Sequence, residues 1–465
     1  MKNGLLSFTL LLFLSCGGEV RPMDKATLSL GQDYVFDIKA LPEIVIDISA
    51  GEWNKLLKYY QQNPENEECV HADFTFIKDG QSQTLWNIGF RVRGNGFSRV
   101  CPENDYVHTP GKTEWNQSHF RIDFDKFSPK QDFHTLKAMN LKAFNGDPAM
   151  VREIYCMDLF QRFGVFVAPK SAYVCLSIYV RGDPAPVYYG VYRMNESVDS
   201  VMIKNRFPGN KLGYLWKCLW PANLIHASME GKIGIEDISP VSKGMSKSYP
   251  YDLKTKKKDF EKAKELLLDF AYNLNYLEGD ELKKWLEQNF EVQLFLKAYA
   301  VNVMVGMWDD YWGNNNNYYL YRHPSGKWYF IPYDYDNTLG TAVGTMDATK
   351  DVMAWGSYAE RPLIDKILSI PEYSKAYQGY IAELIDPKNG LFDTAASMAR
   401  IAEWQAMIAE SVGNDTTGPQ AIKDKPADWG RYGYYRLLSG SDDTPGEVNY
   451  FLQKIKYVKE QLSIK

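Results

Sequence analysis

An aromatic hairpin between Asn317 and Pro332 constrains the fold more than any other stretch of this chain. Two segments rich in tyrosine and other aromatic residues, typical of β-strands, flank a turn at residues 323–326. If that turn closes a regular hairpin, Asn317 pairs with about Pro332, and Asp334 lies a residue or two beyond the second strand. We therefore expect the side chains of Asn317 and Asp334 to meet at one end of the hairpin.

Acidic residues gather at the same end of the hairpin. An apolar helix predicted over residues 280–308 runs into Asp309 and Asp310, and the second strand runs into Asp334 and Asp336. Carboxylate and amide oxygens are the ligands that magnesium prefers. In phosphoryl transfer one aspartate orients the incoming hydroxyl and accepts its proton, while an asparagine and a second aspartate hold the metal. Such residues are also common in plain turns, but the combination favours a functional site.

The size of the chain predicts more than one compact unit. Its 465 residues exceed one ordinary domain, so we expect two lobes or domains that share a cleft. Hydrophobic (45%), aromatic (14%) and charged (24%) residues occur at the fractions usual for globular proteins. The net charge of -5 gives no general attraction to nucleic acid, which we do not expect as a partner.

The N-terminus has the pattern of an export signal. Lys2 precedes a short apolar stretch at residues 5–14, and the sequence Phe-Leu-Ser-Cys-Gly-Gly at its end, residues 13–18, resembles the lipobox of bacterial lipoproteins. We predict a signal peptide over residues 1–16 that ends at a lipidated Cys16, and a polar tether over residues 17–33. The expected location is the cell envelope, with a lipid anchor in a membrane. Ordinary signal cleavage and release is the alternative.

The remaining pattern predicts an α+β fold. We expect a β-rich N-terminal lobe over residues 34–215 and a mainly helical C-terminal lobe over residues 216–465, which includes the catalytic hairpin at 308–340. Strands are predicted at residues 44–48, 74–77, 88–93, 120–124, 172–176 and 187–193, and helices at residues 147–163, 259–274, 280–308, 371–386, 390–412 and 445–463. Of the five later cysteines, Cys69 and Cys101 are a conceivable disulfide pair.

The stretch MWDDYWGNNNNYYLYRHPSGKWYFIPYDYDNTLG at residues 307–340 resembles the diagnostic region of the spore-coat CotH kinase family. The resemblance covers about residues 40–345 and includes FRVRGNGFSR (90–99), HFRIDFDKFSP (119–129) and YYGVYRMNESVD (188–199). It implies a secreted or surface protein with an atypical protein-kinase-like, bilobal fold. The implied activity transfers phosphate from ATP, with magnesium or manganese, to serine or threonine of protein substrates.

The resemblance also implies roles for individual acidic residues. By motif position, Asp309 is the catalytic-loop aspartate, with Asp310 as the close alternative. Asp334 matches the metal-binding aspartate, and Asp336 supports it. The asparagine of the metal site falls on Asn317 or, because this loop contains extra residues, on Asn314.

Residues of the first lobe are candidates for contacting the nucleotide. They are Arg91, Arg93, Glu196 and Lys217. Many members of the family carry a lysine just before the strand at 119–124, whereas this chain has Asn-Gln-Ser-His there. A missing phosphate-binding lysine would weaken ATP binding unless Lys137, Lys142 or an arginine takes its place. A structural role for Arg91 and Arg93, as partners in exposed salt bridges on a strand, is the alternative to a phosphate contact.

Two other classes of function compete with a kinase. A catalytically degenerate kinase fold would act as a surface module that binds proteins or glycans, and the missing lysine favours this alternative. A metal-dependent hydrolase or a calcium-binding domain is a weaker alternative, because the acidic residues do not have the spacing of a twelve-residue EF-hand loop.

Overall fold

The computed structural model describes residues 20–464, except for 95–98, 113, 146, 148, 342–345, 357–359, 418–420, 423–436 and 441–444. The predicted signal peptide, the lipidation site Cys16 and the first residues of the predicted tether lie outside the described residues. Within the described part, no helix is both long enough and apolar enough to span a membrane.

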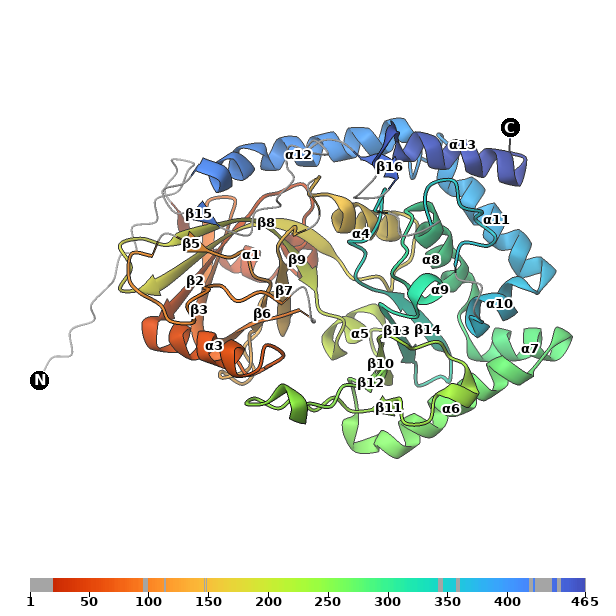
Figure 1. The fold of residues 1–465 in the computed structure, drawn as a ribbon, viewed down its shortest axis with the longest axis horizontal. Helices are drawn as coiled ribbons and strands as arrows, with labels where there is room; N and C mark the ends of the chain where they lie inside the picture. The colour runs from red at the N-terminus through yellow and green to blue at the C-terminus, as the bar shows by residue number, and fades with distance from the viewer. Residues whose placement is uncertain are drawn as a thin grey trace, which may run out of the picture.

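Seven strands of the first half form a closed β-barrel, in the left half of Figure 1. They are β2 (Glu43–Ser49), β3 (Val70–Lys78), β4 (Gln81–Val92), β6 (Phe120–Asp123), β7 (Ala138–Lys142), β8 (Ser171–Arg181) and β9 (Val187–Glu196). Neighbouring strands follow the order β4-β3-β2-β8-β9-β7-β6, and a pairing of β6 with β4 closes the ring. Within the ring β2 and β8 are parallel and the other neighbours are antiparallel.

Alternating side chains fill the barrel. On β2, Ile44, Ile46 and Ile48 are fully buried, as expected when every second residue of a strand faces the same side. The helix α3 (Ala50–Gln62) begins directly after β2, because the hydroxyl of Ser49 accepts a hydrogen bond from the first helical turn. The barrel therefore has its own hydrophobic core, separate from that of the second half.

The second half is built on a five-stranded sheet that carries the aromatic hairpin. Its strands are β10 (Tyr214–Cys218), β11 (Ile233–Gly234), β12 (Tyr251–Leu253), β13 (Tyr318–Arg322) and β14 (Trp328–Pro332), in the order β11-β12-β10-β13-β14. The surrounding helices are α6 (Phe260–Tyr276), α7 (Gly279–Asn289), α8 (Val292–Met304), α9 (Tyr311–Asn314), α10 (Pro362–Leu368), α11 (Pro371–Ile385), α12 (Thr394–Thr417) and α13 (Tyr450–Leu462). At the top of Figure 1, α12 and α13 run along the outer side of the molecule, and α12 contacts strand β9 of the barrel.

Shorter elements complete the fold. They are β1 (Arg21–Pro22), α1 (Lys25–Leu28), α2 (Gln32–Val35), β5 (Glu114–Trp115), α4 (Arg152–Arg162), α5 (Ser200–Arg206), β15 (Ala421–Ile422), β16 (Leu438–Gly440) and β17 (Pro445–Asn449). Among them, α4 packs between strand β8 of the barrel and helix α8 of the second half. This helix therefore joins the two cores.

The structure confirms the mixed α+β class, but the helix predicted over residues 280–308 is wrong in its length. Two helices, α7 and α8, occupy that stretch, and the chain is extended at Phe290 between them. There the backbone N–H of Glu291 donates to the carbonyl of Trp328 at 2.9 Å. The break lets the chain bond to the hairpin strand β14, a long-range contact that a helical repeat cannot reveal.

Three local predictions are shifted. The helix predicted over residues 445–463 begins only at Tyr450, because strand β17 occupies residues 445–449. In the hairpin Tyr318, not Asn317, lies opposite Pro332. The helix predicted from Asp147 begins only at Arg152, and the carboxylate of Asp147 instead accepts the backbone N–H groups of Arg152 and the residue before it, at 2.9 and 3.0 Å. Asp147 thus stabilises the start of α4 from outside the helix.

The cysteines that the structure describes are all free and buried, so the conceivable disulfide between Cys69 and Cys101 is wrong. Burial raises the pKa of both thiols, Cys69 to about 12 and Cys101 to about 11, which keeps them protonated and unreactive at neutral pH.

Candidate functional site

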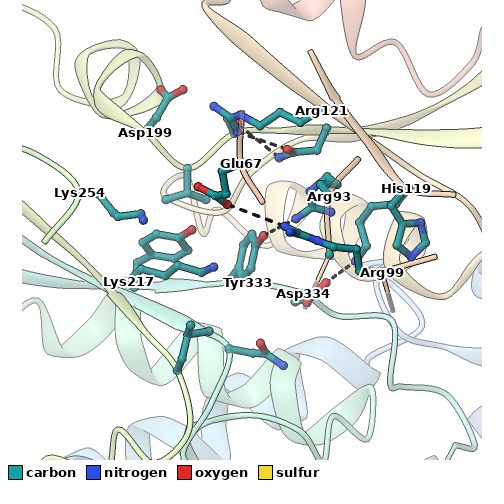
Figure 2. Close-up of a pocket in the computed structure, with 18 of the residues that line it drawn as sticks. Glu67, Arg93, Arg99, His119, Arg121, Asp199, Lys217, Lys254, Tyr333 and Asp334 are labelled. Carbon is teal, nitrogen blue, oxygen red and sulfur yellow. Dashed lines mark hydrogen bonds and ion pairs between the residues drawn. The ribbon is translucent and has the colours of Figure 1, made fainter. Parts of the chain in front are cut away.

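A cavity of about 580 Å³ lies between the barrel and the five-stranded sheet (Figure 2). Strands β4, β6 and β7 contribute Arg91, Arg121 and Lys142 to its wall, and strands β10 and β13 of the opposite sheet contribute Lys217 and Tyr319. The lining also includes the segment that follows β14. Most of these side chains are charged or polar, so the cavity suits a ligand that carries charge.

Asp309 lines this cavity, and its carboxylate accepts hydrogen bonds from three asparagine side chains. Asn314 donates to its Oδ1 at 2.7 Å, Asn316 to the same oxygen at 3.3 Å, and Asn317 to its Oδ2 at 3.0 Å. Burial raises the pKa of Asp309, with a further contribution from the nearby Asp334, while the asparagine hydrogen bonds oppose this rise. The result is an oriented carboxylate with increased proton affinity, which is the property that a general base needs.

Asp310 has a different position. Its side chain is buried, and it caps α9 by accepting the backbone N–H of Gly313 at 2.7 Å and the amide of Asn302 at 2.7 Å. A Cβ at Gly313 would lie 2.0 Å from the carbonyl oxygen of Trp308, so this tight loop requires glycine. Asp310 is not among the residues that line the cavity, so of these two neighbouring aspartates Asp309 is the one that faces the cavity.

Asn317, directly before β13, and Asp334, shortly after β14, both line the cavity. Both have a left-handed backbone, with φ of 52° and 64°. Asparagine and aspartate adopt this conformation at lower cost than other residues, and such backbone conformations cluster at functional sites. The amide of Asn317 donates to Asp309, so Asn317 joins the hairpin end to the aspartate loop.

Lys142, at the end of β7, is the centre of a buried charged network beside Asp334. Its ammonium lies 3.0 Å from Glu153 and 3.2 Å from Asp336, and it also bonds directly to Asp334. Arg193 joins Glu153 and Asp336, each at 2.9 Å. Of the possible replacements for the missing lysine, Lys142 and arginines such as Arg93 line the cavity, whereas Lys137 is not among the lining residues.

The charges in this network determine the protonation state of Asp334. Burial acts to raise the pKa of Asp334, but Lys142, together with Arg93 and Arg193, outweighs burial and holds that pKa well below its usual range. Asp334 is therefore ionised at any physiological pH. An ionised carboxylate of this kind can ligate a hard cation.

The donor set near Asp334 fits magnesium. Carboxylate oxygens of Glu153, Asp334 and Asp336 lie within 4.8 Å of one another. Lys142 lies among them and already neutralises part of their charge. Asp334 and Asn317 also line the cavity, and the oxygen atoms of their side chains are of the donor type that magnesium takes.

Glu153 and Arg193 were not recognised in the sequence. Glu153 lies on α4 among buried apolar residues and is itself 1% exposed, as is Arg193 on β9. A charged residue on the apolar face of a predicted helix is the signal that would have identified Glu153, because such a charge is rarely buried without a partner.

The residues predicted to contact the nucleotide divide into two groups. Arg91, Arg93 and Lys217 line the cavity, and Arg93 donates to the hydroxyl of Tyr333 at 3.1 Å. Glu196 does not line it, because its buried carboxylate pairs with Arg206 on α5 and caps a neighbouring backbone N–H. Glu196 therefore connects strand β9 to helix α5 and is not among the residues that line the cavity.

His119 is a buried, neutral member of the cavity wall. Its Nδ1 accepts the backbone N–H of Ala143 at 2.9 Å, next to Lys142. Burial, with the positive charges of Lys142 and Arg93, lowers the pKa of His119 well below its usual value. His119 thus positions the end of β7 without adding charge.

Residues 90–454 match the family model described as CotH kinase protein. Two proteins of the fungus Rhizopus delemar, Invasin CotH2 and Invasin CotH3, are each 22% identical to the chain. These alignments cover 66% and 76% of the chain, but 46% and 53% of the two relatives. Spore coat protein homolog 1 of the same fungus is 27% identical over 118 residues, which are 23% of the chain and 19% of that protein. The chain spans about half the length of the first two curated relatives.

Proposed function

Because the chain belongs to the CotH kinase protein family, we propose that it is a protein kinase that transfers the γ-phosphate of ATP to serine or threonine. The observation that carries this proposal is that Asp309 and Asp334 line one cavity, with Lys142 paired to Glu153 beside them. Protein kinases use a base, a metal-binding aspartate and a lysine–glutamate pair in combination. On this proposal the barrel and the helical half act as the two lobes of a kinase-like arrangement.

Asp309 is the proposed base. The acceptor hydroxyl donates its proton to Asp309 as its oxygen forms a bond to the γ-phosphorus, and the bond from that phosphorus to ADP breaks. Asn314 and Asn317 hold both oxygens of Asp309, so the carboxylate is oriented before the substrate arrives. Preorganisation of this kind lowers the cost of reaching the transition state.

Asp334 and Asn317 are the proposed magnesium ligands, with Asp336 and Glu153 in support. When bound, magnesium neutralises phosphate charge and orients the phosphates. Lys142 and Arg93 are near enough to Asp334 to lower its pKa, so they are also placed to neutralise phosphate oxygens. Manganese offers the same coordination and is the expected substitute.

Labelling with γ-labelled ATP tests this proposal. The purified chain is incubated with magnesium or manganese, and labelling of the chain and of an added serine-rich protein is compared among wild type, Asp309→Asn and Asp334→Asn. Loss of the base is expected to slow transfer by about a hundredfold or more. Asp280→Asn, at an exposed position in the first turn of α7, is the matched control and should label like wild type.

Nucleotide binding separates the roles of the two aspartates. Asp309→Asn should keep the wild-type affinity for magnesium-ADP, and Asp334→Asn should lose most of it. Equal labelling in all variants refutes the mechanism. Nucleotide binding without transfer in the wild type would instead support the alternative, a degenerate kinase fold that binds proteins or glycans at a surface.

We propose in addition that the chain is exported and anchored to a membrane of the cell envelope through a lipid on Cys16. The support is the lipobox-like sequence after a short apolar stretch. Metabolic labelling with a tritiated fatty acid should mark the wild type and not Cys16→Ala. Equal labelling of both proteins, or recovery of the wild type in the soluble fraction, would contradict the anchor.

A further inference from the structure

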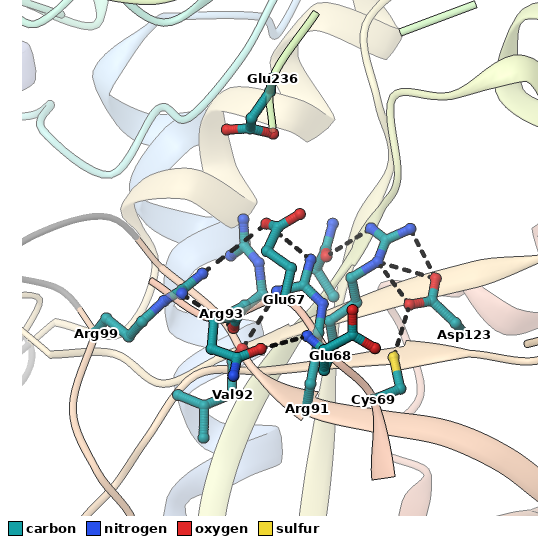
Figure 3. A network of polar contacts seen from close by, with 12 residues as sticks. Glu67, Glu68, Cys69, Arg91, Val92, Arg93, Arg99, Asp123 and Glu236 are labelled. Carbon is teal, nitrogen blue, oxygen red and sulfur yellow. Dashed lines mark hydrogen bonds and ion pairs between the residues drawn. The ribbon is translucent and has the colours of Figure 1, made fainter. Parts of the chain in front are cut away.

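Four basic side chains surround the carboxylate of Glu67 at one end of the cavity (Figures 2 and 3). Arg91 lies 3.1 Å and Arg99 4.0 Å from its Oε1. Burial acts to raise the pKa of Glu67, but Arg91, Lys254, Lys217 and Arg99 together lower it to about 2. Glu67 therefore stays ionised among these cations, of which Lys254 is also paired with Glu236 and Asp252.

Two arginines also face each other where the barrel closes. Arg91 on β4 and Arg121 on β6 are directly opposite in the strand register, and both line the cavity. Like charges at such positions destabilise a sheet. Each is offset by its own carboxylate, Arg91 by Glu67 at 3.1 Å and Arg121 by Asp123 at 2.8 Å. Stability alone gives no reason for this pair, whereas binding an anion does.

Lys217 adds a cation from the opposite sheet. It lies on β10 and reaches into the cavity in Figure 2. Its neighbour across the sheet, Asp252, bonds instead to Lys254. In the part of the chain that the structure describes, the ammonium of Lys217 forms no hydrogen bond or ion pair, so it is available to a ligand.

The side chain of Glu67 can move away from the basic groups without a change in the fold. The loop that carries it is fixed at its base, since the amides of Asn63 and Asn66 donate to the carbonyls of Ser239 and Pro240, each at 2.6 Å. The side chain of Glu67 itself is 43% exposed. Rotation of this side chain toward solvent is enough to expose the basic groups.

We propose that this basic end of the cavity, defined by Arg91, Arg99, Lys217 and Lys254, binds a phosphate monoester that the acceptor substrate already carries. Glu67 occupies the place of that phosphate until the acceptor arrives. A phosphate dianion neutralises several cations better than a single carboxylate does, and arginine binds phosphate through two parallel hydrogen bonds.

The two lysines of the phosphate site lie apart from Asp334 of the proposed transfer site. Asp334, which bonds to Lys142, lies beyond Tyr333 as seen from Lys217 and Lys254 in Figure 2. Because both ends belong to one cavity, an acceptor held by its phosphate presents a neighbouring hydroxyl toward Asp309. The identity of the ligand as an acceptor rests on the proposed kinase activity, whereas the binding of a phosphate monoester does not.

Calorimetry on the full chain without nucleotide tests the binding. The probes are a phosphoserine peptide, its unphosphorylated counterpart, and myo-inositol hexakisphosphate, which separate a phosphoprotein from a small phosphorylated polyol as the source. Lys217→Gln should weaken binding of the phosphorylated probe roughly tenfold, since one charge-assisted contact is lost. Glu67→Gln should strengthen it, because the internal competitor loses its charge. Lys204→Gln, an exposed control on α5, should match wild type.

The opposite signs expected for Lys217→Gln and Glu67→Gln distinguish a ligand site from a structural role, which would change both variants in the same direction. Magnesium-ADP affinity is measured on the same proteins and should stay within about twofold for Lys217→Gln. An equal loss for magnesium-ADP would assign the basic end to the nucleotide and overturn the proposal, as would equal binding of phosphorylated and unphosphorylated peptide. Absence of transfer together with selective phosphate binding would reject the kinase activity but keep this site.

Discussion

Replacing Lys142 with methionine tests whether the buried network beside Asp334 is held together by one charge. In the wild type, Lys142 bonds to Glu153, Asp334 and Asp336, and all four side chains are in the same network. The variant keeps the volume of the side chain but leaves Arg193 as the network's remaining positive partner for Glu153 and Asp336. Removing one partner from a buried ion-pair network costs about 3–5 kcal/mol.

The loss of stability in Lys142→Met should depend on pH in a defined direction. In the wild type the folded pKa of Asp334 lies below its unfolded value, so this group adds stability above about pH 4 and loses it as the pH falls further. Without Lys142 that contribution disappears at neutral pH. As the variant is acidified, protonation of Asp334 and Asp336 relieves their repulsion, so the deficit should shrink to roughly half by pH 4.5.

Urea unfolding followed by tryptophan fluorescence at pH 7 and pH 4.5 measures both values. Lys204→Met, at an exposed position on α5, is the matched control and should change the free energy of unfolding by less than about 0.5 kcal/mol. A deficit below about 1 kcal/mol for Lys142→Met at pH 7, or an equal deficit at both pH values, would refute the idea that Lys142 neutralises these carboxylates.

Three further outcomes are expected. Burial raises the pKa of Asp310 from 3.8 to about 6, so ionisation of Asp310 costs stability as the pH rises through this interval. The thermal midpoint of the wild type should therefore fall relative to that of Asp310→Asn between pH 4 and 6. The same pH dependence of the midpoint in both proteins would contradict this. Lys454 is buried over the ring of Trp355, at 4.4 Å, and burial lowers the pKa of Lys454 to about 7. Lys454→Met should therefore stabilise the protein at pH 7 by about 4 kcal/mol. Most of this gain should be lost by pH 10, and a loss of stability at pH 7 would contradict the reasoning. Gly313→Ala places a Cβ 2.0 Å from the carbonyl of Trp308, and it should cost about 1–3 kcal/mol in thermal unfolding; an unchanged midpoint would show that the loop adjusts freely.

Features that depend on neighbouring residues could be predicted from the sequence. The hairpin appears as β13 and β14, because its aromatic strands and its turn are local signals. The same holds for the shared cavity of Asp309 and Asp334, since both follow directly from elements that meet at one end of the hairpin. The error of one residue in the register came from the turn, whose geometry fixes which residues pair.

Features that depend on distant segments could not be predicted. Closure of the barrel requires β4 to pair with β6, while β7 pairs with both β6 and β9, and no local pattern encodes this. Lys142 and Glu153 are close in the sequence, but Asp334 and Asp336 reach them from the other half of the chain. Only the assembled fold shows that Lys142, at the end of β7, lies beside Asp334 and Asp336.

The meeting of Arg91 and Arg121 across the closing strands has a mechanical consequence. The join between β4 and β6 turns a curled sheet into a cylinder, and it carries a built-in repulsion at its centre. An anion bound there stabilises the closed barrel relative to any opened form by the free energy of its own binding. The stability of the closed barrel would then increase with the concentration of that anion in solution.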